Sequence, residues 1–356
     1  MKIAIDITPI KGDLQGHKVR GVGFYLEYLK RSLLQYQSEH TFVFFARGEA
    51  IDKTVDLVHY PYFEPFFITL PIFENHKRVI TVHDLTPLVF PKHFPAGVKG
   101  NLSWQVQKIN LKNSQRIIGD SEASQRDIAK IAGIKKEKID VVYLAAAEEF
   151  KEKEDGSASR RRKNELRKKY NLPEKFVLYV GDVTWNKNLP RMIEAIKKVK
   201  LPLVMVGKTL VEKKFDQKNP WNKDLVAVQK LTEDVDYIHK LGFVPTDDLV
   251  ALYNCATVFV MPSVYEGFGL PILEAMQSGC PVITTKGGSL PEVAGDSAYY
   301  VDGYDMTSIA NGIEKVFSTK DLQETLIKKG REQAKKFSWE KTAQQTIAAY
   351  KQCLSL

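Results

Sequence analysis

The sequence predicts an α/β protein with two domains, each a parallel β-sheet that is covered by helices on both faces. Its 356 residues are too many for a typical single core. Short apolar runs alternate with helical patterns along the chain, which is the arrangement of parallel α/β sheets. The alternation stops once, near residues 151–169, and then restarts. We therefore expect an N-terminal domain over residues 1–155 and a C-terminal domain over residues 165–337.

In the N-terminal part, short apolar runs have the length and composition of buried strands, and helical patterns separate several of them. The expected strands are residues 2–7, 41–46, 57–60, 79–83, 116–119 and 139–144. The expected helices are residues 23–34, 98–111 and 123–132.

The same pattern returns in the C-terminal part. The expected strands are residues 176–180, 203–206, 258–261 and 282–284. The expected helices are residues 189–199, 248–255, 270–278, 306–317 and 322–336. A last helix begins at Ser338, a good N-cap before Trp339. Ligands of open parallel sheets bind beyond the carboxyl ends of the strands, so two such domains facing each other would form a cleft there.

The break between the two parts contains a basic run, since residues 160–169 hold seven Lys or Arg and one acid. It is interpreted as a solvated linker into the first helix of the C-terminal domain, with a patch for anionic lipid head groups as the alternative. The formal net charge of +9 favours acidic partners. No zinc-finger, RNA-recognition or basic-helix pattern occurs, so nucleic acid is not an expected partner.

Cysteine content and hydropathy favour a cytoplasmic protein. The three cysteines are scattered and odd in number, which argues against a disulfide framework. No segment reaches the roughly 18 apolar residues that span a bilayer. The early acid Asp6 argues against a signal peptide. No Cys/His spacing indicates zinc, and the pair Asp234 and Asp236 is interpreted as a surface turn, so no metal site is expected.

The most informative local pattern is residues 261–274, Met-Pro-Ser-Val-Tyr-Glu-Gly-Phe-Gly-Leu-Pro-Ile-Leu-Glu. An apolar strand ends at Met261, a loop follows, and a helix opens near Leu270. Pro271 suits the first helical turn, where its missing N–H costs nothing. The free N–H groups at such a helix start can bind phosphate, helped by the helix dipole.

Two acids frame this loop. Gly267 and Gly269 allow the backbone to approach a ligand closely. Glu266 lies in the loop, where it can reach a sugar. Glu274 lies about one turn into the helix, where a carboxylate can accept two hydrogen bonds from a ribose diol. The alternative is that both acids simply favour a helix N-terminus.

The Glu-x7-Glu spacing of Glu266 and Glu274 resembles the signature of the retaining glycosyltransferases of the GT-B fold, family 4, and the resemblance extends across nearly the whole chain. It implies two Rossmann-like domains, with a final helix over residues 338–356 that packs back on the N-terminal domain. It also implies a nucleoside-diphosphate-sugar donor, retention of anomeric configuration, and no metal or cofactor. Donor-binding positions in this pattern are Glu274 and, from the loop, Gly267, Phe268, Gly269 and Leu270.

Residues 177–189 resemble the family's strand, loop and helix that hold the diphosphate. On this resemblance Lys187 is the main cation and Asn188 a donor-binding neighbour. A cation is unfavourable at a helix N-terminus unless an anion is bound, which also favours a ligand role for Lys187. The alternative is a solvated lysine in the first turn.

Further segments match the same family. His83, which follows the strand 79–83, is similar to the histidine beneath the donor sugar. Val244 lies in a segment that resembles the one whose backbone meets the nucleobase. Gly21 and Gly23 fit the glycine-rich loop that faces the diphosphate, with an ordinary turn as the alternative. Residues 286–292 match the family's next loop and are interpreted as packing first and binding second.

The resemblance implies roles for these residues in catalysis. Lys187, with Arg20 as a further candidate, would neutralise the leaving diphosphate. Glu266 would position the donor ring, and His83 would hold sugar hydroxyls near the anomeric carbon. No enzymatic nucleophile is evident, so the hypothesis is a front-face reaction in which the leaving phosphate takes the acceptor proton.

The expected partners are a nucleotide sugar and a glycan or lipid-linked acceptor of cell-surface polysaccharide synthesis. A hexose is expected, with mannose favoured, and the expected location is the cytoplasm or the inner face of the membrane. The aromatic residues 60–67 are interpreted as loop packing, with contact to the acceptor as the alternative. Two other functions remain open: a non-catalytic subunit that binds nucleotide sugars, and a nucleotide-sugar epimerase of the same fold.

Overall fold

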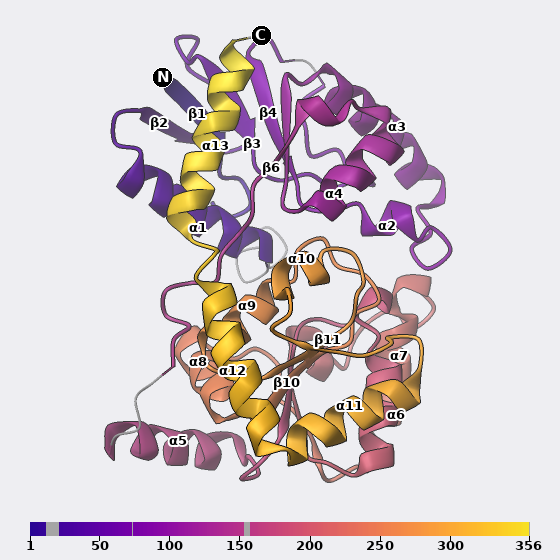
Figure 1. Cartoon of the computed structure of the whole chain (residues 1–356). Helices are drawn as coiled ribbons and strands as arrows, with labels where there is room; N and C mark the ends of the chain where they lie inside the picture. Colours follow the sequence, from indigo (N-terminus) through magenta and orange to yellow (C-terminus); the bar gives the residue numbers. More distant parts are fainter. Residues whose placement is uncertain (12–20, 73, 153–156, 356) are drawn as a thin grey trace. The chain divides into compact units, whose positions relative to one another are not determined.

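The computed structural model describes residues 1–11, 21–72, 74–152 and 157–355. These residues form two compact units. Unit 1 comprises Met1–Ala145 together with Phe337–Leu356, and unit 2 comprises Ala146–Lys336. Each unit contains one six-stranded parallel sheet with flanking helices, which confirms the predicted fold class (Figure 1).

The sheet of unit 1 has the strand order β2-β1-β3-β4-β5-β6, and every neighbouring pair is parallel. The strands are β1 (Lys2–Asp6), β2 (Thr41–Phe45), β3 (Leu57–Tyr60), β4 (Lys77–Val82), β5 (Arg116–Gly119) and β6 (Ile139–Val141). Most inner residues of β1, β3, β4 and β5 are buried because helices cover both faces, and most of them are apolar.

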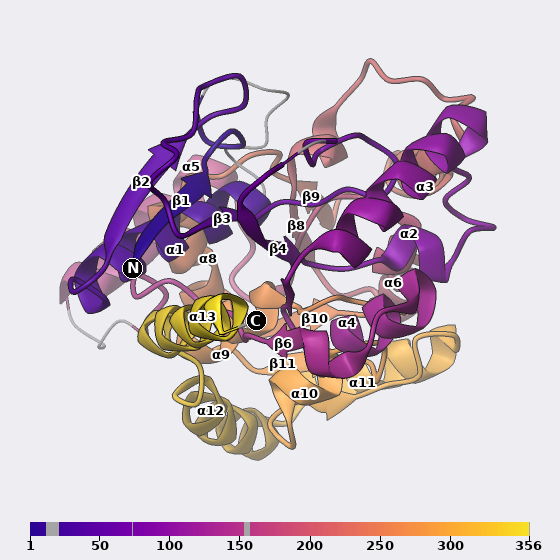
Figure 2. The same ribbon diagram turned by 90° about the horizontal axis from the view of Figure 1, so that it is seen from above.

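The helices of unit 1 are α1 (Gly21–Tyr36), α2 (Thr86–Val89), α3 (Gly97–Asn113), α4 (Glu122–Asp127) and α13 (Trp339–Leu354). The hydroxyl of Ser338 caps α13 by accepting a hydrogen bond from the Lys341 amide at 3.2 Å. Helix α13 packs against α1 and against β3, β4 and β5. In both views α13 lies apart from α3, which packs on the opposite face of the sheet (Figures 1 and 2).

The sheet of unit 2 has the strand order β12-β11-β10-β7-β8-β9 and is also entirely parallel. The strands are β7 (Val177–Val180), β8 (Leu203–Val206), β9 (Ile238–Lys240), β10 (Val258–Met261), β11 (Val282–Thr284) and β12 (Tyr299–Tyr300). The helices are α5 (Ser157–Tyr170), α6 (Leu189–Val199), α7 (Lys223–Leu231), α8 (Thr246–Cys255), α9 (Leu270–Gln277), α10 (Leu290–Ala294), α11 (Met306–Ser318) and α12 (Lys320–Ala334).

The basic run, residues 160–169, lies entirely within α5, so the linker expected there is a helix. Part of this helix is bound to the rest of unit 2. Asp248 on α8 is nearly fully buried. It forms ion pairs with Arg162 and with Lys169, the latter at 2.6 Å, and accepts a hydrogen bond from the Tyr170 hydroxyl at 2.7 Å. These contacts fasten α5 to α8, so at least two cations of the run have a structural role.

Candidate functional site

The strand order of unit 2 reverses between β10 and β7. After β7 the chain continues to β8 and β9 on one side of the sheet, and after β10 it continues to β11 and β12 on the other. The two loops that leave these neighbouring strands therefore diverge at their carboxyl ends. This is the position where open α/β sheets bind ligands.

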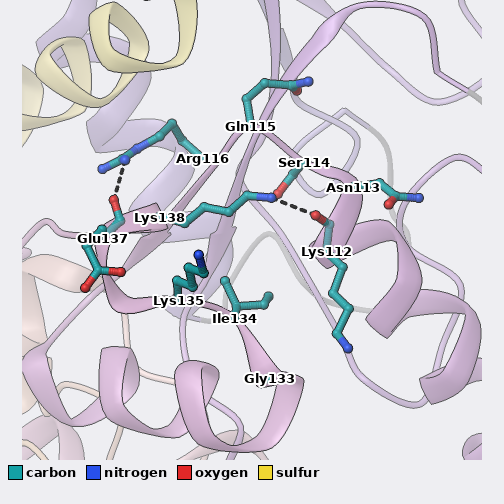
Figure 3. A pocket seen from close by; sticks show the side chains of 10 residues that line it. All are labelled: Lys112, Asn113, Ser114, Gln115, Arg116, Gly133, Ile134, Lys135, Glu137 and Lys138. Carbon is teal, nitrogen blue, oxygen red and sulfur yellow. Dashed lines mark hydrogen bonds between the residues drawn. The ribbon is translucent and has the colours of Figure 1, made fainter. Parts of the chain in front are cut away.

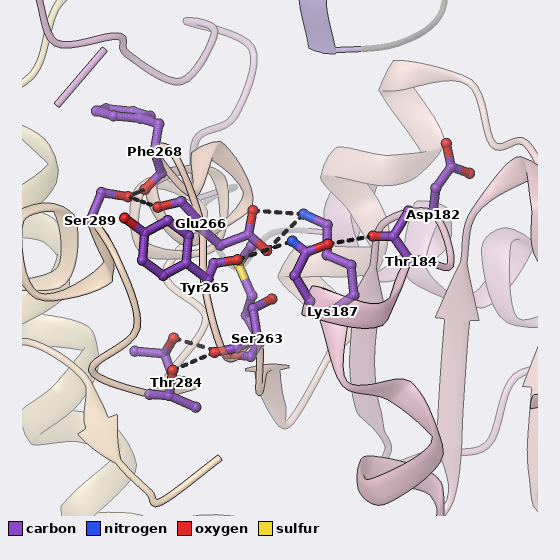
Figure 4. A network of polar contacts seen from close by, with 12 residues as sticks. Asp182, Thr184, Lys187, Ser263, Tyr265, Glu266, Phe268, Thr284 and Ser289 are labelled. Atoms are coloured by element: carbon purple, nitrogen blue, oxygen red, sulfur yellow. Dashed lines mark hydrogen bonds and ion pairs between the residues drawn. The ribbon is translucent and has the colours of Figure 1, made fainter. Parts of the chain in front are cut away.

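An ion pair joins these two loops. The Nζ of Lys187, in the loop after β7, lies 2.8 Å from each carboxylate oxygen of Glu266, in the loop after β10 (Figure 4). Both side chains are largely withdrawn from solvent, with 22% of Lys187 and 10% of Glu266 exposed. An ammonium group has three donors, so this lysine can hold Glu266 and an anion at once.

Two asparagines fix Lys187 in this place. Asn186 donates from Nδ2 to the Tyr265 carbonyl at 3.0 Å, and its own carbonyl accepts from the Val264 amide at 2.8 Å. Asn188 has a left-handed backbone with φ of 61°, a conformation that asparagine tolerates. Its Nδ2 donates to backbone carbonyls of Pro262 at 3.0 Å and Gly303 at 2.7 Å. The buried amide of Asn188 is thus used within the protein, in positioning the loop.

The loop after β11 supports the Glu266 loop from behind. The hydroxyl of Ser289 donates to the carbonyls of Glu266 at 3.0 Å and Phe268 at 2.7 Å (Figure 4). Gly288 has φ of +61°, and a Cβ at this position would lie 2.3 Å from the Glu266 carbonyl oxygen. Residues 286–292 therefore pack against the candidate site, and this contact requires glycine.

Helix α9 begins directly after this loop. Its N-cap is Gly269 with φ of +99°, where a Cβ would lie 2.9 Å from Leu290. Pro271 lies in the first turn, as expected. Phe268 is buried and Leu270 partly exposed. The hydrogen bond from Ser289 to the Phe268 carbonyl holds the backbone just before α9, and the lack of space beside Leu290 requires glycine at position 269.

Glu274 lies further along α9 and faces α8. Its carboxylate accepts a hydrogen bond from the Tyr253 hydroxyl at 2.9 Å, and 7% of the residue is exposed. Burial raises the pKa of Glu274 to about 7, although the bond from Tyr253 favours the charged form. This carboxyl group therefore changes its charge near neutral pH.

His83 belongs to unit 1, directly after β4. Its Nδ1 lies 2.7 Å from Asp120, and its Nε2 lies 3.2 Å from the Pro61 carbonyl. The ring packs edge-on against Tyr25, with centroids 4.7 Å apart. Burial opposes a charged ring, but the charge and hydrogen bond of Asp120, with Asp84, outweigh it and raise the pKa of His83. An imidazolium can donate from both nitrogens, which fits this pair of acceptors.

Comparisons with known proteins follow the same division of the chain. Residues 162–333 match the family model "Glycosyl transferases group 1", and residues 9–147 match "Glycosyltransferase Family 4". Over 286 residues the chain is 30% identical to O-antigen chain mannosyltransferase B of Escherichia coli, an alignment that covers 77% of this chain and 70% of that protein. The chain belongs to glycosyltransferase family 4.

Other relatives of this glycosyltransferase differ in length. It is 28% identical over 288 residues to the serotype-specific mannosyltransferase WbdA of Escherichia coli. This alignment covers 78% of this chain and 34% of the length of WbdA. The solved structure of sucrose-phosphate synthase from Thermosynechococcus elongatus superposes with a TM-score of 0.77 at 19% identity, covering 100% of this chain and 99% of that one. The shared fold is the GT-B fold.

The remaining predicted residues of the glycosyltransferase occupy varied positions. Gly21 and Gly23 lie in the first turn of α1, which begins two residues before the helix start expected at Gly23. Their place opposite the diphosphate stays a prediction. Arg20 lies outside the described residues. Val244 is buried just before Pro245, the N-cap of α8. The lysine and the acids of unit 2 are gathered around β7, β10 and α9, whereas His83 and the two glycines belong to unit 1.

Several neighbours of the site were not predicted. Tyr253 and Asp120 contact predicted residues from other parts of the chain. The position of Asp120 could have been predicted from the sequence, because it directly follows β5 just as His83 directly follows the adjacent strand β4. Within the described residues, no cluster of three or more His, Cys, Asp or Glu side chains could hold a metal ion. In the same residues, no helix has both the length and the apolar character for a membrane span.

Proposed function

We propose that this glycosyltransferase transfers a hexose, with mannose favoured, from a nucleoside-diphosphate sugar to a glycan or lipid-linked acceptor in cell-surface polysaccharide synthesis. The observation that carries the proposal is the Lys187–Glu266 pair at the carboxyl ends of β7 and β10. The preference for mannose and for polysaccharide synthesis rests on the name of its relative, O-antigen chain mannosyltransferase B. On this proposal unit 2 binds the donor, and unit 1 supplies acceptor determinants.

The diphosphate of the donor would bind between Lys187 and the start of α9. Lys187 keeps Glu266 with one N–H and offers another to a phosphate oxygen. Pro271 has no N–H, and the Ile272 amide donates to the Gly269 carbonyl at 3.0 Å, so the Leu270 amide and the helix dipole would add the second favourable field for the same anion. These groups stabilise the negative charge that develops as the diphosphate leaves, which needs no metal ion.

The remaining groups would bind the sugar and the ribose. Glu266 accepts hydrogen bonds from hydroxyls of the transferred sugar, while Lys187 holds its carboxylate in place. Glu274 accepts from the ribose diol. His83 donates to a sugar hydroxyl from Nε2, and the 3.2 Å bond to Pro61 is the contact that it would exchange.

The chemical step would be a front-face displacement with retention. The bond from the anomeric carbon to the diphosphate breaks, and the acceptor oxygen forms its bond to that carbon on the same face. The acceptor proton passes to the leaving phosphate oxygen, so no side chain acts as the nucleophile. A covalent sugar adduct on Glu266, detected by mass spectrometry, would contradict this mechanism.

The deciding experiment is a thermal-shift screen of nucleotide sugars followed by a product assay. A ligand that binds only the folded state raises the melting temperature and thereby identifies base and sugar. The active donor is then supplied with and without glycan acceptors, and the anomeric configuration of the product is read by NMR. Epimerised donor without an acceptor would identify an epimerase instead. Binding without any turnover would identify a non-catalytic subunit.

A further inference from the structure

The outward face of α3 in unit 1 is unusually apolar. Val98, Leu102 and Ile109 are 79%, 64% and 59% exposed. Their spacings of four and seven residues place them along one side of the helix. The inward face of the same helix includes the buried polar residues Gln107 and Asn110. That face also buries Trp104 and Leu111 in the core, so α3 carries apolar side chains on both faces, whereas a surface helix normally has a polar outward face.

The inward polar residues of α3 have a structural task. Nε2 of Gln107 donates to the Glu64 and Phe67 carbonyls at 3.1 and 2.7 Å, and to the Thr69 hydroxyl at 2.6 Å. These bonds hold the segment 64–69 beneath the helix. The ring of Phe67, on that segment, is 67% exposed. Packing therefore explains the inward face, while the outward apolar residues have no such explanation.

Positive charge accompanies the outward apolar residues. Helix α3 contains Lys99, Lys108 and Lys112 and no acid. Its last turn borders a hollow of about 640 Å³, whose lining includes Lys112, Lys135 and Lys138 (Figure 3). In the part of the chain that the structure describes, Lys112 and Lys135 form no ion pair. The hollow, called the basic basin below, is thus lined by several lysines and lies next to the exposed apolar residues of α3.

We propose that α3 and this basin form a docking surface for an anionic phospholipid bilayer. Val98, Leu102 and Ile109 would enter the boundary between head groups and acyl chains, and the lysines would meet the lipid phosphates. Charge complementarity favours this occupant over a second copy of the chain, since two copies would bring the same lysines together. The basic run in α5 is less suited, because Arg162 and Lys169 are already paired with Asp248.

The test uses the full chain and vesicles of phosphatidylglycerol with phosphatidylethanolamine, compared with vesicles of phosphatidylcholine. We expect binding to the anionic vesicles alone, weakened by salt. The triple variant Val98→Ser, Leu102→Ser, Ile109→Ser should bind at least about ten-fold more weakly. The double variant Lys112→Gln, Lys135→Gln should lose about five-fold per lysine on anionic vesicles.

The matched control replaces three exposed apolar residues elsewhere, Leu34, Val211 and Phe243, by serine. It should bind vesicles like the wild type. Thermal melting verifies that each variant is folded. Undiminished vesicle binding by the α3 triple variant, or equal binding of the wild type to neutral vesicles, would overturn the proposal. So would a wild-type dimer that the triple variant converts to a monomer without any change in vesicle binding, because the face would then be a subunit interface.

Discussion

At the scale of single residues, Lys187 and Glu266 form an ion pair, so a substitution of the lysine also changes the environment of the carboxylate. Removing the ammonium group in Lys187→Ala should lower kcat by about 100-fold or more, the usual effect of losing one charge contact to the transition state. The melting temperature should fall as well, because the side chain of Glu266 is only 10% exposed and loses the cation that pairs with it. Lys187→Arg, which keeps the charge, should retain more activity. Turnover of Lys187→Ala within a few-fold of the wild type would mean that this lysine does not hold the diphosphate.

Glu274 predicts a specific dependence of stability on pH. Its pKa is raised from 4.5 to about 7, so the folded protein binds the proton more tightly than the unfolded chain. Its contribution to stability is therefore fully present below pH 4.5 and is lost as the pH rises through 7. Glu274→Gln removes the charged form and keeps the shape. The variant should gain up to about 3 kcal/mol on the wild type between pH 5 and pH 8.

Urea unfolding of both proteins at the two pH values measures this difference. Glu332→Gln serves as the control, because Glu332 is exposed and its pKa is lowered by Lys335. That variant should not gain stability on the wild type as the pH rises. A Glu274→Gln difference that is the same at pH 5 and pH 8 would show that the carboxyl group is not desolvated in the folded state.

Sequence alone could locate part of the site. Lys187 and Glu266 each follow a strand and precede a helix start, so local patterns are sufficient to place them at strand ends. Tyr253 and Asp120 are different, because their contacts with Glu274 and His83 arise from packing between elements that are distant in the sequence. No local pattern encodes which side chain lies opposite another.

At the scale of elements, the support of the Glu266 loop can be tested with Gly288→Ala. The alanine would have to adopt a φ near +60°, and its Cβ would lie 2.3 Å from the Glu266 carbonyl oxygen. We expect a loss of stability well above the 1–2 kcal/mol that a left-handed residue alone costs, together with a lower kcat. The matched control is Gly97→Ala, with φ of +63° and open space around the new Cβ. Equal losses in the two variants, measured by chemical unfolding, would contradict a steric role for Gly288.

Element boundaries show what sequence patterns can and cannot supply. The strands β3, β5, β8, β10 and β11 begin and end at the predicted residues, because each is a compact apolar run. Strand β12 was not predicted, since two residues show no periodicity. The helix expected at 123–132 is α4 followed by a π-helix, Ile128–Gly133. That change in hydrogen bonding depends on tertiary packing and leaves the apolar pattern unchanged.

At the scale of the whole molecule, the chain leaves unit 1 after Ala145 and returns to it at Phe337. The return is made by α13, which packs on strands that lie more than 200 residues earlier in the sequence. Periodicity predicted this helix and its Ser338 cap, but only the family resemblance indicated where it packs. The same applies to the strand orders, because an apolar run does not specify its neighbour in a sheet.

A buried hydrogen bond joins α13 to strand β3, and removing it tests how much this helix contributes to the stability of unit 1. Tyr350 lies 2.7 Å from Nδ1 of His59, whose Nε2 lies 2.8 Å from the Thr81 hydroxyl. Burial lowers the pKa of His59 to about 3, so the ring is neutral, with one nitrogen donating and the other accepting. Tyr350→Phe leaves a buried nitrogen unpaired and should cost about 1–3 kcal/mol in chemical unfolding. Tyr300→Phe, which removes a half-buried bond to the Gly295 carbonyl, should cost less, because water can replace the hydroxyl. Equal costs would show that closure of unit 1 does not depend on this bond.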